Sequence, residues 1–514
     1  MSRQFRRADY QATLEVQVRL GDCLAPDHPA RFLVDLLGLV DFSAFQARFA
    51  ARGGRPYDPA VLCGLLIYGY LHGLFSSRKI ERATYEDLGF RYVAGNMHPD
   101  HDTLANFRKT FLADLTEVFV QVLLVAKASG VLLLAAASND GTKIHADASK
   151  SAAVSYGRMQ ELEQELRTEV AAILAKAQAA DGSDEATRLR GEVDRREARL
   201  AQLAQARAVL EARAAARDAE EQAAYQAKVA ARHAKAARTG KPPRGREPQP
   251  PASGPRAKDQ YNFTDPESRI MKESTSGAFE QSYNAQVVTD QASMLVMGAR
   301  VSDQPNDVQE LLPTLDAIPA VVGTPATAAS DAGFFSEPNI IGCLVRGIEP
   351  YIATGRESHR WSLEDVLNGP APVDPGAQPT PRALMAAKLR TAEGRAIYRQ
   401  RKCTVEPVIG IIKDVLGFRQ FSLRGLAQVR GEWILVCLAY NIKRLHTLLG
   451  GVVPQPAHLT PLLAAMVLLL RSALAPWCRR GLCSQRIPRP RRPAPALAFN
   501  IVGPCLADFS PTGC

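Results

Sequence analysis

An abrupt change of composition near residue 156 constrains the fold of this 514-residue chain more than any other feature. From there to about residue 241 the sequence is rich in Ala, Glu, Arg and Gln. Apolar residues recur every three or four positions on either side of a polar turn, "DGSD": Met159, Leu162, Leu166, Val170 and Ile173 before it, and Leu189, Val193, Leu200, Leu203 and Leu210 after it. This pattern predicts an antiparallel coiled-coil hairpin. Beyond Leu210 the seam residues become Ala, so we expect a frayed helix and then a disordered linker.

The sequence on both sides of the hairpin predicts a layered α/β sheet. The apolar run "VLLLAAA" leads into "SNDGTKI" before the hairpin, and the strand-like segments "FEQSYNAQVVTD" and "SMLVMGARVS" follow it. Two helices are expected next, one beginning after Gln304 in "PNDVQELLPTLDAI" and one in "SEPNIIGCLVRG". They alternate with two short strands, in "PATAAS" and "IEPYIAT". This order favours a mixed sheet in which "FEQSYNAQVVTD" and "SMLVMGARVS" are antiparallel neighbours. The hairpin is then an insertion between the first and second strands.

Four parts of the chain follow from these patterns. Residues 1–130 are predicted to be all-helical, residues 131–155 and 259–450 form the divided α/β domain, and residues 156–258 are the hairpin with its linker. Residues 451–514 are expected to be a C-terminal helix and a basic tail rich in Pro and Arg. The helical part carries basic residues at positions including Lys79 and Arg108. The pattern alone leaves open whether it binds DNA or is a plain helical bundle with solvated charges.

The charge balance favours a polyanionic partner. The chain has 63 Lys and Arg against 53 Asp and Glu, a formal net charge of +10 and a pI near 9.2. It has no apolar segment after its first residues that would make a signal peptide, and its apolar runs are too short to span a bilayer. We therefore expect a cytoplasmic protein with no membrane partner.

Three acidic residues far apart in the sequence are candidates for one metal site. Asp140 stands where the first predicted strand stops, and Asp331 follows another short apolar strand. Glu406 precedes Pro407, a residue that suits the first turn of a helix, and we expect Glu406 at the start of that helix with Lys413 near the same face. Two divalent ions held by carboxylates can activate water or a 3′-hydroxyl and stabilise the leaving oxygen of a phosphodiester. With 53 acidic residues available, other triples are possible, and a solvated surface charge is the usual role.

Several short sequence motifs, in the order in which they occur, resemble those of one known family. They are "NDGTKIHADASK", "TDPESRIMK", "SYNAQVVTD", "ASDAGFFSEPNI", "PYIATGR" and "YRQRKCTVEPVIGIIK", preceded by "RPYDPAVLCGLLIYGYLHGLFSSRKIE" and "HDTLANFRK". The chain resembles the bacterial insertion-sequence transposases of the DDE type, close to the IS-eleven-eighty-two group, together with their N-terminal helical domain. The resemblance runs from about residue 25 to residue 446.

The resemblance implies an RNase H-like catalytic domain that binds two Mg²⁺ or Mn²⁺ ions through Asp140, Asp331 and Glu406. It also implies a DNA-binding signature on the helix around Glu406: Tyr398, then Arg401 or Lys402 as the basic residue, and Lys413. From the residues alone, an ordinary amphipathic helix face is the preferred interpretation of these four residues. Trp433 could stack on a DNA base, but its apolar neighbours favour core packing.

The function expected from the resemblance is that of a DNA transposase. It would bind the terminal inverted repeats of its element, cleave the DNA ends by metal-assisted hydrolysis and join the 3′-hydroxyls to target DNA, as a homodimer or higher oligomer at the nucleoid. The alternative is a decayed copy that only binds DNA or serves as a scaffold. The intact Asp140, Asp331 and Glu406 argue against this alternative.

Overall fold

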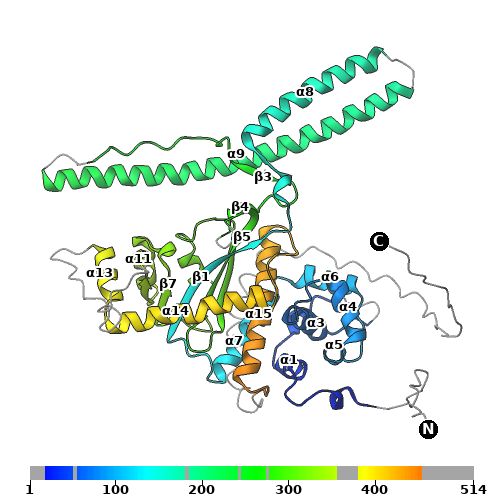
Figure 1. Cartoon of the computed structure of the whole chain (residues 1–514), viewed down its shortest axis with the longest axis vertical. Helices are drawn as coiled ribbons and strands as arrows, with labels where there is room; N and C mark the ends of the chain where they lie inside the picture. Colours follow the sequence, from blue (N-terminus) through cyan, green and yellow to red (C-terminus); the bar gives the residue numbers. More distant parts are fainter. Residues whose placement is uncertain are drawn as a thin grey trace, which may run out of the picture.

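The computed structural model describes residues 18–49, 55–179, 184–240, 245–273, 277–355 and 380–453. The predicted basic tail from residue 454 onward lies outside these residues. Figure 1 shows three parts: a helical region, a sheet covered by helices, and a long helical hairpin that projects from the body.

The helical region is confirmed, and its caps explain where several helices start. Asp58, Asp87 and Asp100 each accept a backbone N–H at the start of a helix, and Pro59 occupies the first turn of its helix. The elements are η1 (Leu20–Cys23), α1 (Pro29–Leu37), α2 (Ser43–Gln46), α3 (Pro59–Leu71), α4 (Ser77–Glu86), α5 (Leu88–Val93), α6 (His101–Phe111) and α7 (Leu115–Ala128).

The sheet is mixed, as predicted. Its strands run in the order β4-β5-β1-β7-β8, and β6 also pairs with β5. β5 is antiparallel to β1, β4 and β6, whereas β1, β7 and β8 are parallel to one another. The strands are β1 (Ala136–His145), β4 (Arg269–Lys272), β5 (Phe279–Asp290), β6 (Val296–Ser302), β7 (Thr327–Ser330) and β8 (Glu349–Ile352).

Two expected element boundaries in the sheet region are wrong. The first strand begins at Ala136, near the end of the apolar run rather than at its start, and it continues to His145, so Asp140 lies in mid-strand instead of at its end. The helix expected after Gln304 is only the short α10 (Leu311–Leu315). By contrast, α11 (Glu337–Val345) matches its prediction and follows the turn η3 (Ala332–Phe334).

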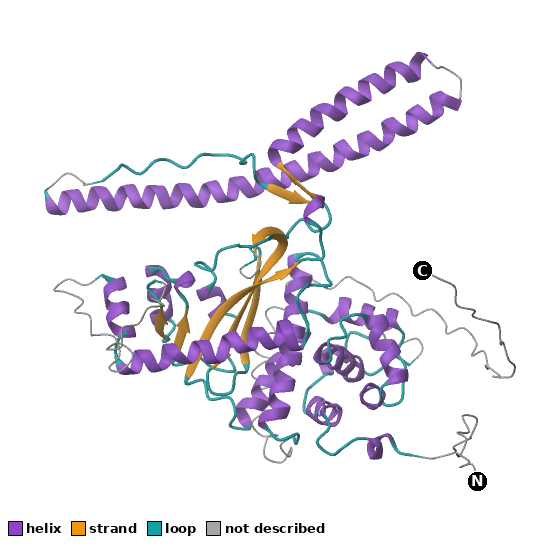
Figure 2. Ribbon diagram, viewed as in Figure 1, coloured by secondary structure: helices purple, strands orange, loops and turns teal. Residues whose placement is uncertain are grey.

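Three further helices cover the sheet: α13 (Pro381–Leu389), α14 (Ala392–Gly410) and α15 (Leu426–Leu448). α14 crosses the sheet, and α15 stands between the sheet and the helical region (Figures 1 and 2). α15 packs against β6 on one side and against α3 and α7 on the other, so one apolar core continues from the sheet into the helical region. Trp433 is fully buried in this core and donates its Nε1–H to the Gln286 carbonyl at 3.1 Å, which confirms its packing role.

The insertion is a helical hairpin whose base is closed by a two-stranded ladder. β2 (Ala153–Ser155) pairs antiparallel with β3 (Gln260–Asn262), and α8 (Tyr156–Ala179) packs against the first half of α9 (Asp184–Thr239). The predicted seam faces inward, with Met159, Leu203 and Leu210 buried. A coiled coil in the strict sense stays a prediction.

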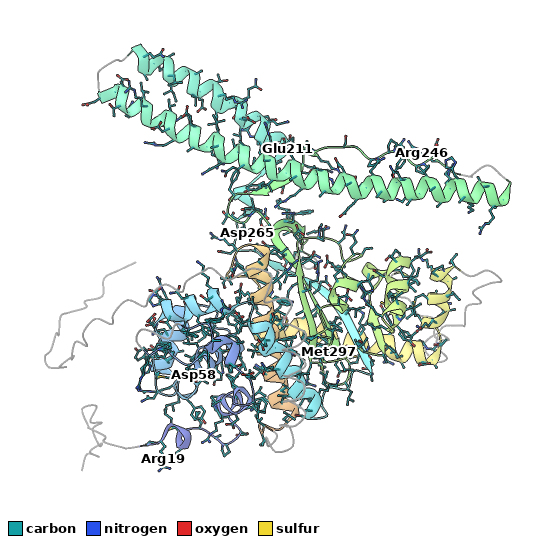
Figure 3. The ribbon with its side chains drawn as sticks, turned by 180° about the vertical axis from the view of Figure 1, so that it is seen from behind. Arg19, Asp58, Glu211, Arg246, Asp265 and Met297 are labelled. Carbon is teal, nitrogen blue, oxygen red and sulfur yellow. The ribbon has the colours of Figure 1, made fainter. Side chains whose placement is uncertain are left out.

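The region beyond Leu210 differs from its prediction. The second helix is not frayed there but runs on to Thr239, and residues 245–258 return along it as an extended chain instead of a disordered linker. Figure 3 shows Glu211 at the base of the hairpin and Arg246 on the returning chain. Among the described residues, no helix combines the length and apolarity that a membrane span requires.

Candidate active site

Asp140 lies on the middle strand of the sheet, on the face that α14 covers. It pairs with Val287 of β5 across the antiparallel ladder. Two residues earlier on the same face, Ser138 is joined to α14 by a hydrogen bond of 2.9 Å between its hydroxyl and that of Thr404. This buried contact fixes the helix over the strand that carries the aspartate.

Asp331 reaches the same place because of the register between parallel strands. Asn139 of β1 pairs with Ser330 of β7, and this is the last pair between the two strands. The next residue on each side is an aspartate, Asp140 in β1 and Asp331 directly after β7. The Asp331 carboxylate caps the turn that follows, accepting the Gly333 N–H at 2.9 Å. The strand pairing therefore places Asp331, directly after β7, next to Asp140 of β1.

Glu406 lies near the end of α14 and not at the start of a helix, so the expected helix boundary is wrong. The helix begins much earlier, after Thr391, whose hydroxyl accepts the Gly394 N–H at 3.0 Å. Pro407 lies inside it, and the helix continues into a π-helical turn, Ile411–Val415. Proline removes one backbone donor and disfavours a regular continuation, and packing against the sheet retains the helix here.

Arg401 joins two of the three acids. Its guanidinium donates to Asp140 Oδ2 at 3.2 Å through Nη1 and to Glu406 Oε1 at 2.9 Å through Nη2. The Arg401 side chain is only 8% exposed, against 18% for Asp140 and 48% for Glu406. A planar guanidinium suits this double contact, whereas the ammonium of a lysine would be a single point charge. Of the two basic residues offered by the sequence, Arg401 therefore contacts the acids, while Lys402 is exposed.

The acids influence one another electrostatically. Burial raises the pKa of Asp140 to about 7, the positive charge of Arg401 opposes this rise, and the negative charges of Asp331 and Glu406 add to it. Burial tends to lower the pKa of Arg401, but the nearby Asp140 and other negative groups outweigh it and raise that pKa. The site is thus a cluster of negative charge around one buried cation.

The other signature residues occupy two different settings. The Arg401 guanidinium lies 5.8 Å from the centroid of the Tyr398 ring, so Tyr398 flanks the acid cluster. Lys413 lies in the π-helical turn, and its pKa is lowered by burial. The charges that act on Lys413 come from Glu273, Arg419 and other nearby groups. Lys413 thus lies in a second charged neighbourhood beyond the acids.

The donor chemistry of the three acids fits a hard divalent cation, because Mg²⁺ and Mn²⁺ prefer carboxylate oxygens. Among the residues that the structure describes, however, no three His, Cys, Asp or Glu side chains are grouped closely enough to hold a metal ion. The guanidinium of Arg401 lies between Asp140 and Glu406 and neutralises them. The acids therefore match a hard metal ion in their donor chemistry, but in this arrangement they are not grouped closely enough to hold one.

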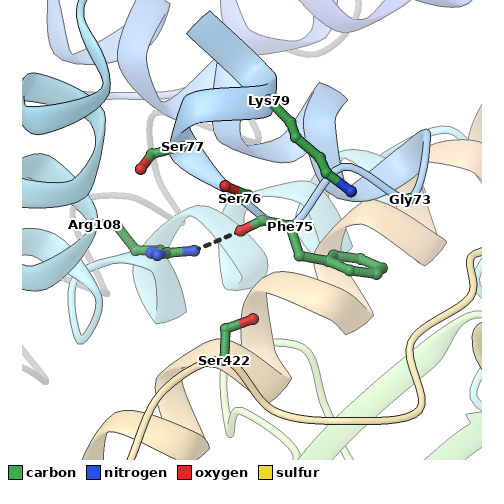
Figure 4. A pocket seen from close by; sticks show the side chains of 7 residues that line it. All are labelled: Gly73, Phe75, Ser76, Ser77, Lys79, Arg108 and Ser422. Atoms are coloured by element: carbon green, nitrogen blue, oxygen red, sulfur yellow. Dashed lines mark hydrogen bonds between the residues drawn. The ribbon is translucent and has the colours of Figure 1, made fainter.

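A polar pocket lies where the helical region meets the loop before α15. It has a volume of about 320 Å³ and is lined by Gly73, Phe75, Ser76, Ser77, Lys79, Arg108 and Ser422 (Figure 4). Arg108 is held there by the Phe75 carbonyl at 2.9 Å and the Tyr70 hydroxyl at 3.1 Å. Tyr70 in turn donates to the buried carboxylate of Glu432 on α15 at 2.9 Å. The pocket thus presents two cations and three hydroxyl-bearing residues at the junction of two parts of the chain.

Sequence reasoning did not single out the groups that hold this site together. The Ser138–Thr404 bond and the Tyr70–Glu432 bond join residues more than 250 positions apart, and no local pattern signals either contact. Lys79 and Arg108 were recognised only as part of a basic helical face.

Comparisons with known proteins agree with this arrangement of a helical region and a catalytic region. Residues 18–110 match a family described as a transposase domain (DUF772), and residues 250–442 match a family described as a transposase DDE domain. No curated protein and no solved structure matches the chain. The first match covers helices α1 to α6 and the second covers the chain from residue 250 to α15, so both parts of the body match transposase families, and the chain belongs to the DDE transposases of insertion sequences.

Proposed function

We propose that this transposase cleaves the ends of its element by metal-assisted phosphodiester hydrolysis and transfers the freed strands to target DNA, with Asp140, Asp331 and Glu406 as the metal-binding and catalytic acids. The observation that carries the proposal is the placement of these acids on β1, the end of β7 and α14, with Arg401 between two of them. Two Mg²⁺ or Mn²⁺ ions bound there would activate the attacking water or 3′-hydroxyl and stabilise the leaving oxygen.

The strand arrangement supports an RNase H-like assignment for the catalytic domain. An antiparallel group of strands, β6-β5-β1, continues into a parallel group, β1-β7-β8, and the proposed acids lie at the central strand and its parallel neighbour. In open sheets, functional groups collect where neighbouring strands end and a loop begins. We assign residues 131–155 and 259–450 to this domain and residues 1–130 to the DNA-binding domain.

The chain's own residues would position the DNA. Arg401 contacts the carboxylates of Asp140 and Glu406 in the structure. With metal ions bound to these acids, its guanidinium would be available to bind a phosphate, together with Tyr398, Lys402 and Lys413. Such a phosphate would lie beside the acids, close to the bond that is cut.

The terminal inverted repeats would be bound by the helical region. The junction pocket supports this assignment, because Lys79 and Arg108 together with Ser76 and Ser77 offer the donors that a backbone phosphate accepts (Figure 4). The remaining features expected from the resemblance belong to this proposal: the IS-eleven-eighty-two group, a homodimer or higher oligomer on paired ends, and a nucleoid-associated protein of the cytoplasm. A decayed, non-catalytic copy is not favoured, since all three acids are present.

The test is cleavage of labelled DNA that carries the element's flanking repeats, with Mg²⁺ or with EDTA. Asp140→Asn, Asp331→Asn and Glu406→Gln should each reduce cleavage by at least about 10³-fold, since each removes a charged ligand while preserving shape. Binding to the repeats should persist in all three. Asp316→Asn is the matched control, because Asp316 is an exposed acid that pairs with Arg346 just after α11 and has no role in the proposed site. Cleavage by any of the three variants at the wild-type rate would remove that residue from the site.

A further inference from the structure

The second hairpin helix is more than twice as long as the first. α8 has 24 residues and α9 has 56, so the pairing ends near Glu211, to which the Tyr156 hydroxyl donates at 3.1 Å. From there α9 continues alone to Thr239, and residues 245–258 return along it. We call the part of α9 from residue 213 to residue 239, together with the returning residues 245–258, the distal arm.

Specific contacts hold the returning chain against the helix. Arg217 pairs with Asp259 at 3.0 Å, Arg256 pairs with Glu221 at 2.8 Å, and Arg232 donates to the Gly245 carbonyl at 2.9 Å. The returning chain is rich in Pro, which lowers the entropy lost when it is ordered. The distal arm is therefore stabilised by contacts between its helix and the returning chain, and it is not a single unsupported helix.

Charge distinguishes the outer part of the distal-arm helix, residues 222–240, from the paired part of the hairpin. In the paired part, arginines alternate with acids and form ion pairs, such as Arg196 with Glu169 at 2.8 Å and Arg207 with Glu163 at 2.9 Å. Residues 222–240 instead contain no Asp or Glu and carry four cations: Lys228, Arg232, Lys235 and Arg238.

Three of these cations share one face of the helix. Residues 228, 235 and 238 are seven and three positions apart, the spacing of one helical face, whereas Arg232 is held by the returning chain. Lys228, Lys235 and Arg238 are exposed, and within the described residues none of them is paired with an acid. A solvent-exposed helix without a binding partner usually carries both positive and negative side chains, as the paired part of this hairpin does.

We propose that the distal arm binds the phosphate backbone of double-stranded DNA through Lys228, Lys235 and Arg238, without reading its sequence. This proposal rests on the proposed function only in taking DNA as the polyanion that is bound. It adds a DNA-binding surface on the hairpin, separate from the acid cluster. The helix from residue 222 to residue 239 is about 27 Å long at 1.5 Å per residue. That length matches about eight base pairs at 3.4 Å each, enough for several phosphate contacts.

The direction of the distal arm suits this role. In Figure 1 it extends to the side of the molecule on which α11, α13 and the beginning of α14 lie. A duplex that leaves the catalytic face toward that side could continue along the arm. Backbone contacts outside the catalytic domain position DNA and add affinity without specifying sequence.

The experiment measures binding of the full-length protein to a fluorescent duplex of about 40 base pairs of unrelated sequence, in EDTA, at several salt concentrations. The test variant is Lys228→Gln/Lys235→Gln/Arg238→Gln. The matched control is Arg188→Gln/Arg190→Gln/Arg195→Gln, which removes the same charge from exposed positions in the paired half of the same helix. Circular dichroism checks that both keep their helix content, and light scattering gives the oligomeric state.

The test variant should bind at least about tenfold more weakly at 0.1 M salt, and the slope of log K against log salt should fall by about 2–3, since each phosphate contact contributes about 0.9. The control should keep the wild-type slope. Equal affinity and slope for the two variants would overturn the proposal. So would a change of oligomeric state in the test variant with unchanged DNA binding, which would assign the arm to another copy of the chain. Because no cleavage is measured, failure of the proposed nuclease activity would leave this result untouched, and the reverse also holds.

Discussion

At the scale of single residues, the unusual feature is a buried arginine at the place where a cation is expected. Arg401 is 7% exposed and contacts Asp140 and Glu406. Removing one partner of a buried ion pair leaves the other charge uncompensated, which typically costs about 3–5 kcal/mol. Arg401 thus stabilises the metal-free protein by neutralising its acids.

Arg401→Gln should therefore lower the free energy of unfolding by about 3 kcal/mol in EDTA. Lys402→Gln, at the exposed neighbouring position, should change it by less than about 0.5 kcal/mol. Urea unfolding measures both. Adding Asp140→Asn to Arg401→Gln should recover part of the loss, because the buried charge is gone. If Arg401→Gln and Lys402→Gln unfold at the same urea concentration, the buried pair does not stabilise the protein.

The sequence identified the acids but not their surroundings. Asp140 and Asp331 were each expected at the end of a strand of one sheet; this holds for Asp331, which directly follows β7, whereas Asp140 lies within β1. Their choice as catalytic residues stays a prediction. The choice between Arg401 and Lys402 could not be made, since it depends on which side of α14 faces the sheet. Pro407 was misleading, because a local preference for a helix start was overridden by tertiary packing.

At the scale of elements, two helical glycines test how closely the helices pack. A Cβ added at Gly431 on α15 would lie 2.4 Å from Leu112 Cγ at the end of α6, whereas one added at Gly191 on α9 meets no atom within 4 Å. Gly431 therefore permits the close approach of α15 to the helical region.

Gly431→Ala should destabilise the protein by about 1–3 kcal/mol through overpacking. Gly191→Ala should stabilise the hairpin by up to about 1 kcal/mol, because alanine is the better helix former. Thermal unfolding of both variants gives the comparison. A stabilising Gly431→Ala would mean that Leu112 moves aside without cost.

Element boundaries were predicted best where caps or strand patterns are strong. α3 and α11 were recognised because each follows a capping residue and carries Pro in its first turn. The start of β1 was misplaced because residues 131–135 are apolar but have no strand partner, and a strand requires a partner as well as a pattern. The distal half of α9 was underestimated because its support comes from residues that return from beyond the helix.

At the scale of the whole molecule, the helical region and the catalytic region are joined by a buried polar network as well as by apolar packing. The carboxylate of Glu432 accepts from the Tyr70 hydroxyl and from the backbone N–H groups of Ser422 and Leu423. Burial raises the pKa of Glu432, and its hydrogen bond from Tyr70 and the charge of Arg108 only partly oppose the rise.

This raised pKa predicts a pH dependence of stability. The unfolded carboxyl group loses its proton near pH 4.3, whereas the folded one keeps it to higher pH, so the unfolded state binds fewer protons between the two values. Stability due to Glu432 should thus be full below about pH 4.3 and decline as pH rises through the folded pKa. Urea unfolding of the wild type and of Glu432→Gln from pH 4 to pH 8 should show the wild type losing stability relative to the variant. A relative gain with rising pH would mean that the network favours the ionised form.

The closed base of the hairpin also bears on how the chain folds. β1 and β5 are adjacent in the sheet, yet the whole insertion separates them in sequence. Pairing β1 with β5 requires closure of the loop between them. Once α8 and α9 pack and β2 pairs with β3, residues 156–259 no longer contribute to the effective length of this loop. The loop is then roughly fourfold shorter, and the entropic cost of closing it falls by about 1.2 kcal/mol. Once the hairpin has formed, the effective sequence separation between β1 and β5 is small. A large insertion at this position should therefore slow the formation of the native sheet only slightly.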